Sequence, residues 1–107
     1  MPEDSHSTNP ISIGILSGGQ GQRVGGQDKG LLEISGKPLI EYVLQQSQAL
    51  WPSAPILVSA NRNIERYKQY GQVVTDAPEH EGPLAGLAAL LAHCQSEWLI
   101  TLPCDCP

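Results

Sequence analysis

The sequence has few cations and no long apolar run. Its 107 residues contain 6 Lys and Arg against 11 Asp and Glu, which gives a formal net charge of −5. A protein that binds nucleic acid regardless of sequence needs a basic face to displace counterions, so this class is disfavoured. No stretch approaches the ~20 apolar residues of a membrane span. Any polyanion that the protein binds must therefore be met by locally placed cations.

Signal-peptide features and a disulfide framework are also missing. Residues 1–10 lack a basic region followed by an apolar one, so we expect a cytoplasmic protein with a disordered leader over this polar segment. Three cysteines cannot all pair, and Cys104 and Cys106 lie only two positions apart, so reduced thiols are expected. The length allows one domain, which we place at residues 11–107.

Beyond the leader, short apolar runs alternate with helical patterns. They predict strands at residues 11–16, 56–58, 73–75 and 98–102, and helices at 38–51, 63–70 and from 82 onward. The stripe of the first helix includes Leu50, Asn63 is the expected N-cap of the second, and the third is expected to bury Leu84, Leu87, Ala88 and Leu91. Apolar strands that alternate with helices are typical of an α/β fold with a parallel sheet covered on both faces.

The segment after the first predicted strand is rich in glycine and carries two cations. It runs Leu16-Ser17-Gly18-Gly19-Gln20-Gly21-Gln22-Arg23, and Lys29 follows six residues later. A glycine-rich backbone can approach a phosphate closely and direct successive N–H groups at it. In an open parallel sheet the ligand lies beyond the carboxyl ends of the strands, where this segment is expected together with the residues that follow the other strands.

Two common phosphate-binding patterns do not fit this segment. The Walker pattern is absent because Lys29 follows Asp28 and precedes Gly30. The dinucleotide pattern has Val24 where its third glycine belongs, and Ser59 stands where an acidic residue should end the second strand. A P-loop NTPase and a nicotinamide enzyme are both disfavoured. A zinc site at Cys104 and Cys106 is disfavoured too, because too few further ligands lie nearby.

The same residues resemble the nucleotidyltransferases of the glycosyltransferase-A-like fold, and among them the MobA-like molybdenum cofactor guanylyltransferases. The resemblance rests on residues 16–32 with their Asp28-Lys29-Gly30-Leu31 stretch, and continues through residues 36–39, 60–62, 75–76, 82–86 and 103–105. It implies a three-layer α/β/α, Rossmann-like fold similar to the nucleotide-diphospho-sugar transferases. In that fold the mostly parallel sheet has strand order 3-2-1-4, and we expect it to be truncated at the C-terminus.

The resemblance also implies transfer of GMP from GTP to molybdenum-bound molybdopterin, with release of pyrophosphate. The implied catalytic residues are Arg23, Lys29 and Asp105, of which Lys29 contacts the phosphates and Asp105 holds Mg²⁺. Nucleotide-binding positions are implied at Leu16, Ser17, Gly18, Gly19, Ser59 and Asp76. The expected partners are the two small-molecule substrates and proteins that carry or accept the molybdenum cofactor.

This chain departs from the family pattern in two ways. Ser59 occupies a position where the family usually carries Asn, and a hydroxyl cannot donate and accept in the planar manner of an amide. The sequence also stops two residues after Asp105, so we expect the nucleotide half of the site and little of the molybdopterin half. Two alternatives therefore stay open: a nucleotide-binding module without turnover, and a nucleotidyltransferase with a different base or acceptor.

Overall fold

A computed structural model describes residues 10–17, 23–24, 27–75 and 83–104. Its main sheet contains the strands β1 (Ile11–Leu16), β6 (Ile56–Ser59), β7 (Gln72–Val74) and β8 (Trp98–Pro103). They lie in the order β7-β6-β1-β8, and each neighbouring pair is parallel. The predicted strand order 3-2-1-4 and the α/β class are therefore confirmed, and the observed strand ends differ from the predicted ones by one residue at most.

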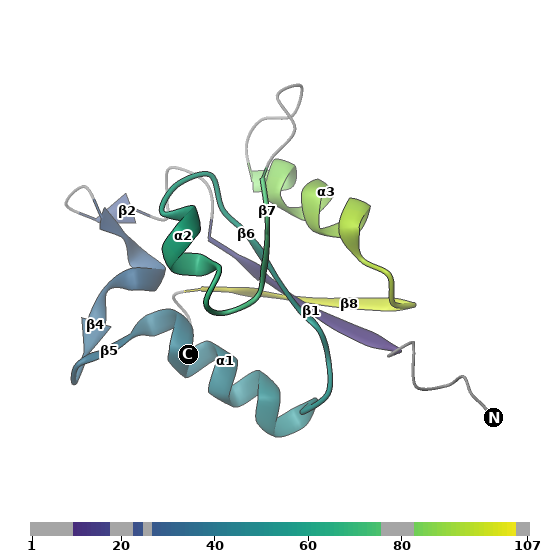
Figure 1. The fold of residues 1–107 in the computed structure, drawn as a ribbon, viewed down its shortest axis with the longest axis horizontal. Coiled ribbons are helices and arrows are strands. Elements are labelled where there is room, and N and C mark those ends of the chain that lie inside the picture. Colours follow the sequence, from purple (N-terminus) through teal and green to yellow (C-terminus); the bar gives the residue numbers. More distant parts are fainter. Residues whose placement is uncertain (1–9, 18–22, 25–26, 76–82, 105–107) are drawn as a thin grey trace.

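Helix α1 (Leu39–Leu50) covers one face of the sheet (Figure 1). Its buried residues Ile40, Val43 and Leu44 pack in one core cluster with Ile13 and Ile15 of β1. Leu50 was wrongly assigned to the buried stripe, because its side chain is 69% exposed. It lies at the last position of the helix, beyond the turns that face the sheet.

Helix α3 (Pro83–His93) covers the opposite face, which completes the three layers (Figure 1). It forms a second core cluster in which Ala89 and Leu90 meet Leu57 and Val74. The predicted buried stripe is wrong at its two ends, because Leu84 is 72% exposed and Leu91 57% exposed, while Leu87 and Ala88 are half-buried. The fully buried residues of the helix are Ala85, Gly86, Ala89 and Leu90. The helix is apolar nearly all round, so periodicity could not select a face, and the small residues bring it closest to the sheet.

The short helix α2 (Ile64–Tyr67) connects β6 to β7 and ends three residues before the predicted end. Asn63 occupies the N-cap position with a φ of 54°, but its side chain makes no capping hydrogen bond. The Tyr70 N–H bonds the Tyr67 carbonyl at 2.9 Å, an i→i−3 bond that tightens the chain into a turn after the helix. Tyr67 is fully buried in the α1-side core cluster and so anchors this connection to the domain.

A side-chain hydrogen bond links this connection to α1. The Tyr70 hydroxyl donates to Oε2 of Glu41 at 2.8 Å. Burial, the hydrogen bond to Glu41 and the negative charge of Glu41 together raise the pKa of Tyr70 to about 12. The neutral phenol is therefore the form that the folded protein favours.

Two small antiparallel ribbons lie between β1 and α1 in the sequence. The first joins β2 (Arg23–Val24) to β3 (Gln27–Asp28), and a 3-10 turn, η2 (Lys29–Leu31), follows directly. The second joins β4 (Glu33–Ile34) to β5 (Lys37–Pro38). Its connecting residues Ser35 and Gly36 have φ angles of 57° and 79°, as a type I′ hairpin turn requires.

No helix within the described ranges is both long and apolar enough to cross a membrane. The predicted leader, residues 1–10, lies outside the described residues except for Pro10. The Pro10 carbonyl accepts a hydrogen bond of 2.9 Å from the N–H of Trp98, the first residue of β8.

Candidate nucleotide site at the carboxyl ends of the strands

The carboxyl ends of the four parallel strands meet in one row. Leu16 of β1 is in register with Ser59 of β6 and with Pro103 of β8, and Ser59 is in register with Val74 of β7. Backbone hydrogen bonds extend the pairing past the strands, from Cys104 N–H to the Leu16 carbonyl at 3.1 Å and from Ala60 N–H to the Val74 carbonyl at 3.0 Å. This edge is thus a continuous, hydrogen-bonded platform.

Ser17 is held tightly where the glycine-rich segment leaves β1. Its hydroxyl donates to the Ser59 carbonyl at 2.5 Å, and its N–H donates to the same oxygen at 3.1 Å. Only 2% of the residue is exposed. The two bonds fix the direction in which the chain enters the predicted phosphate loop.

The side chain of Ser59 is completely buried, and its Oγ has no hydrogen-bond partner among the described residues. A Cβ on Gly86 of α3 would lie 3.0 Å from this oxygen and 3.2 Å from Cδ2 of Leu16. The glycine therefore lets α3 come close to the ends of β1 and β6. A buried hydroxyl without a partner costs free energy, which a bound polar group could recover.

The two predicted cations lie on the β2–β3 ribbon and the turn that follows it. Arg23 is in register with Asp28, and Lys29 begins η2. The Leu32 N–H bonds the Lys29 carbonyl at 3.1 Å and closes this turn. Leu31 is buried in the core beside α1, so the Lys29 turn is anchored to the body of the domain.

The Lys29 turn reaches the end of β8. A Cβ on Gly30 would lie 2.6 Å from Sγ and 2.9 Å from Cβ of Cys104, which is fully buried. Cys104 is in turn bonded through its N–H to Leu16. The structure therefore brings Lys29, Leu16, Ser17 and Ser59 to the same end of the sheet, as the sequence predicts.

Other predicted site residues lie outside the described residues, namely Gly18, Gly19, Asp76 and Asp105. Within the described part of the chain, no three His, Cys, Asp or Glu side chains are grouped so that they could hold a metal ion. Cys94 and Cys104 form no disulfide within that part of the chain. The magnesium ligand predicted at Asp105 stays a prediction.

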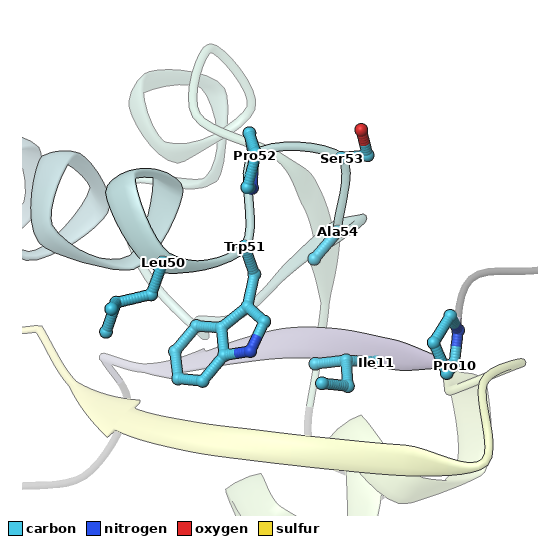
Figure 2. Close-up of a pocket in the computed structure, with 7 residues that line it drawn as sticks. All are labelled: Pro10, Ile11, Leu50, Trp51, Pro52, Ser53 and Ala54. Carbon is cyan, nitrogen blue, oxygen red and sulfur yellow. The ribbon is translucent and has the colours of Figure 1, made fainter.

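A pocket at the opposite end of the sheet is not part of this site. It is lined by Pro10, Ile11, Leu50, Trp51, Pro52, Ser53 and Ala54. Figure 2 shows the Trp51 indole ring extending from the end of α1 over the sheet, toward the strand that begins with Ile11. The lining is largely apolar and has no charged side chain, so it does not fit a triphosphate.

Sequence reasoning missed the buried residues at which the segments that form the site pack together. Cys104 and Tyr67 both lie close to Gly30 from separate segments, and Gly86 approaches Ser59 from a fourth. Gly30 and Cys104 lie inside the motifs that carry the family resemblance, next to Lys29 and Asp105. That adjacency was the available signal, but their mutual contact depends on the tertiary fold.

Comparisons with known proteins agree with this geometry. Residues 13–107 match the family described as a MobA-like NTP transferase domain. A molybdenum cofactor guanylyltransferase of Pseudomonas fluorescens is 50% identical over 109 aligned positions, which cover 100% of this chain and 53% of that protein. A protein of the same name from Vibrio cholerae is 44% identical over 87% of this chain and 45% of its own length.

Among solved structures, a CMP:2-keto-3-deoxy-manno-octonic acid synthetase complexed with CTP has a TM-score of 0.66 at 24% identity, over 90% of this chain and 40% of that one. This likeness shows a shared fold. The chain spans about half the length of the curated relatives that it matches. On its sequence and its architecture, the chain belongs to the MobA-like NTP transferase domain family.

Proposed function

We propose that this chain binds GTP at the carboxyl ends of β1, β6 and β8 and supplies the nucleotide half of a molybdenum cofactor guanylyltransferase. The observation that carries the proposal is the position of the Lys29 turn, which lies against the end of β8 beside Leu16. That arrangement puts a cation where the ligand of an open parallel sheet binds. The family and the names of the relatives favour guanine as the base.

Different residues contact different parts of the nucleotide. Lys29 and Arg23 contact the phosphates, and the N–H groups of the segment that includes Gly18 and Gly19 add further donors. Leu16 and Ser17 border the guanine. Ser59 offers its unpartnered hydroxyl to the nucleoside, and we assign Asp76 to the same pocket.

Asp105 is the residue that would hold Mg²⁺. Mg²⁺ prefers one or two carboxylates and takes its other ligands from phosphates and water. A single carboxylate that follows β8 in the sequence fits this preference. When bound, the ion supplies positive charge that offsets the charge of the triphosphate.

The proposed reaction needs no protein nucleophile. An oxygen of the molybdopterin phosphate attacks the α-phosphorus of GTP, the bond to the β-phosphate oxygen breaks, and pyrophosphate leaves with that oxygen. Both reactants are anions, so most of the barrier comes from charge repulsion and alignment. Arg23 and Lys29 lower this repulsion and orient the triphosphate, while the edge formed by Leu16, Ser17 and Ser59 holds the nucleoside in place.

The acceptor is assigned from the family. Because the chain spans about half of its curated relatives, molybdopterin binding and contact with cofactor-carrying or cofactor-accepting proteins rest on the family alone. We also propose that the protein works in the cytoplasm, where GTP is available.

Calorimetric titration of the chain with GTP, ATP and CTP at fixed Mg²⁺ tests the binding step. We expect GTP to bind more tightly than the other two, and equal affinities would remove the guanine assignment. Addition of molybdopterin then tests turnover through the release of pyrophosphate. GTP binding without pyrophosphate release would favour the nucleotide-binding module over the complete enzyme.

A further inference from the structure

A close contact joins the Lys29 turn to the residue that follows β8. The Cβ position of Gly30 lies 2.6 Å from Sγ of Cys104, 2.9 Å from its Cβ, and 3.3 Å from the hydroxyl oxygen of Tyr67. All three residues are buried, and both Tyr67 and Cys104 are 0% exposed. No side chain other than the hydrogen of glycine fits at position 30 without movement of its neighbours.

The glycine is required for space and not for its backbone angle. Gly36 has a φ of 79°, whereas Gly30 does not adopt a positive φ, so an alanine at position 30 would be free of backbone strain. The neighbours of Gly30 cannot easily give way. Cys104 is tied by its N–H to Leu16, and Tyr67 is enclosed in the core beside α1.

We propose that Gly30 and Cys104, supported by Tyr67, form a packing joint that positions Lys29 on the phosphates of the bound nucleotide. This inference rests on the proposed GTP site. Gly30 and Cys104 are positioning residues: they act through Lys29, the residue next to Gly30, and contact no substrate themselves. Through Cys104 the joint also sets the Lys29 turn relative to the end of β8, after which Asp105 follows in sequence.

The rigidity of the surroundings makes the joint effective. Leu31 is buried beside α1 on one side of Gly30, and Lys29 is hydrogen-bonded through its carbonyl to Leu32. A methyl group forced into the joint must therefore displace the turn as a unit. Misplacement of one charged contact to the phosphates should cost roughly tenfold in affinity.

The test compares Gly30→Ala with Gly14→Ala in the 107-residue chain. Both alanines meet a close neighbour, but the Cβ at position 14 would meet Cδ1 of Leu90 at 2.9 Å in the middle of β1, away from the carboxyl edge. Both variants should lower Tm. Only Gly30→Ala should weaken binding of GTP, by about tenfold, and binding of inorganic tripolyphosphate should weaken in the same proportion.

A second variant separates positioning from general damage. Cys104→Gly removes both side-chain atoms of Cys104, which lie 2.6 Å and 2.9 Å from the Cβ position, so Gly30→Ala/Cys104→Gly should recover much of the affinity that Gly30→Ala loses. If Gly30→Ala does not fold, the double variant relieves these two contacts and is compared with Cys104→Gly alone. Equal phosphate affinity in these two would then support the joint as the source of the damage, and a lasting tenfold deficit in the double variant would contradict it.

Each result has a distinct meaning. If Gly30→Ala folds and binds GTP and tripolyphosphate as tightly as the unaltered chain, the proposed joint is overturned. The proposed GTP site would not be affected by that result. An equal loss of affinity in Gly14→Ala also overturns the joint, because the effect would then follow stability alone. Failure of the unaltered chain to bind GTP overturns the proposed function, and the inference with it.

Discussion

The carbonyl oxygen of Ser59 accepts two hydrogen bonds from Ser17, one from the hydroxyl at 2.5 Å and one from the N–H at 3.1 Å. The pair joins the ends of two neighbouring parallel strands at the point where the glycine-rich segment begins. A change in either residue therefore acts on the nucleotide site and on the sheet at once, and a matched control can separate the two effects.

Replacement of Ser17 by Ala removes one of the two bonds to Ser59. The Ser17 N–H still satisfies the carbonyl, so we expect a loss of about 1 kcal/mol in the free energy of unfolding, measured by urea titration. GTP affinity should fall as well, because the start of the phosphate loop is less firmly held. Ser47→Ala is the control, since this buried hydroxyl bonds the Leu44 carbonyl at 3.0 Å within α1. Similar GTP affinity in both variants would argue against a role for Ser17 at the site.

Ser59→Ala should weaken GTP binding without lowering the free energy of unfolding. The Ser59 hydroxyl has no partner among the described residues, so its removal should leave the free energy of unfolding unchanged or raise it by about 1 kcal/mol. If the nucleoside uses this hydroxyl, GTP affinity should fall several-fold in the same variant. A variant that is less stable and binds GTP normally would place Ser59 in the fold and outside the nucleoside pocket.

The Tyr70–Glu41 bond predicts a specific alkaline dependence of stability. Because folding raises the pKa of Tyr70 from 10.0 to about 12, the contribution is fully present below pH 10 and is lost as the pH rises toward 12. Tyr70→Phe should be less stable by about 1 kcal/mol at neutral pH, and the difference from the unaltered chain should shrink above pH 10. Chemical denaturation between pH 7 and pH 12 measures this difference, and a constant gap over that range would contradict the assignment.

The orientation of α3 can be tested with two adjacent leucines. Leu90 is completely buried and Leu91 is 57% exposed. Leu90→Ala should lower the free energy of unfolding by about 2–5 kcal/mol, whereas Leu91→Ala should change it by about 0.5 kcal/mol or less. The reverse order would restore the stripe that the sequence pattern favoured.

The sequence was most informative where its patterns are local and unambiguous. The runs that begin at Ile11, Ile56 and Trp98 are short, mainly apolar and bounded by polar segments, so their positions and the α/β class could be predicted. Pro38 and the spacing of Ile40, Val43 and Leu44 likewise predicted α1. The edge that carries Leu16, Ser17 and Ser59 follows from this topology.

The features that the sequence did not predict depend on contacts between distant segments or on elements too short to give a pattern. In α3 nearly every position is apolar, so the choice of the buried face was made by the small residues Ala85, Gly86 and Ala89, which fit closest to the sheet. The β2–β3 ribbon has two residues in each strand, too few for a periodic signal. The contact between Gly30 and Cys104 spans most of the chain, and no local pattern reports it.

The most direct test of the account measures the affinity of the chain for GTP with Mg²⁺ before and after Lys29→Ala. Loss of one charged contact to the phosphates should weaken binding by about tenfold or more. The control is Lys68→Ala, which removes an exposed cation whose Nζ lies 3.0 Å from Oε2 of Glu65, and GTP affinity should be unchanged in that variant. Equal affinity in the Lys29 and Lys68 variants would contradict the claim that the turn after β3 binds the triphosphate.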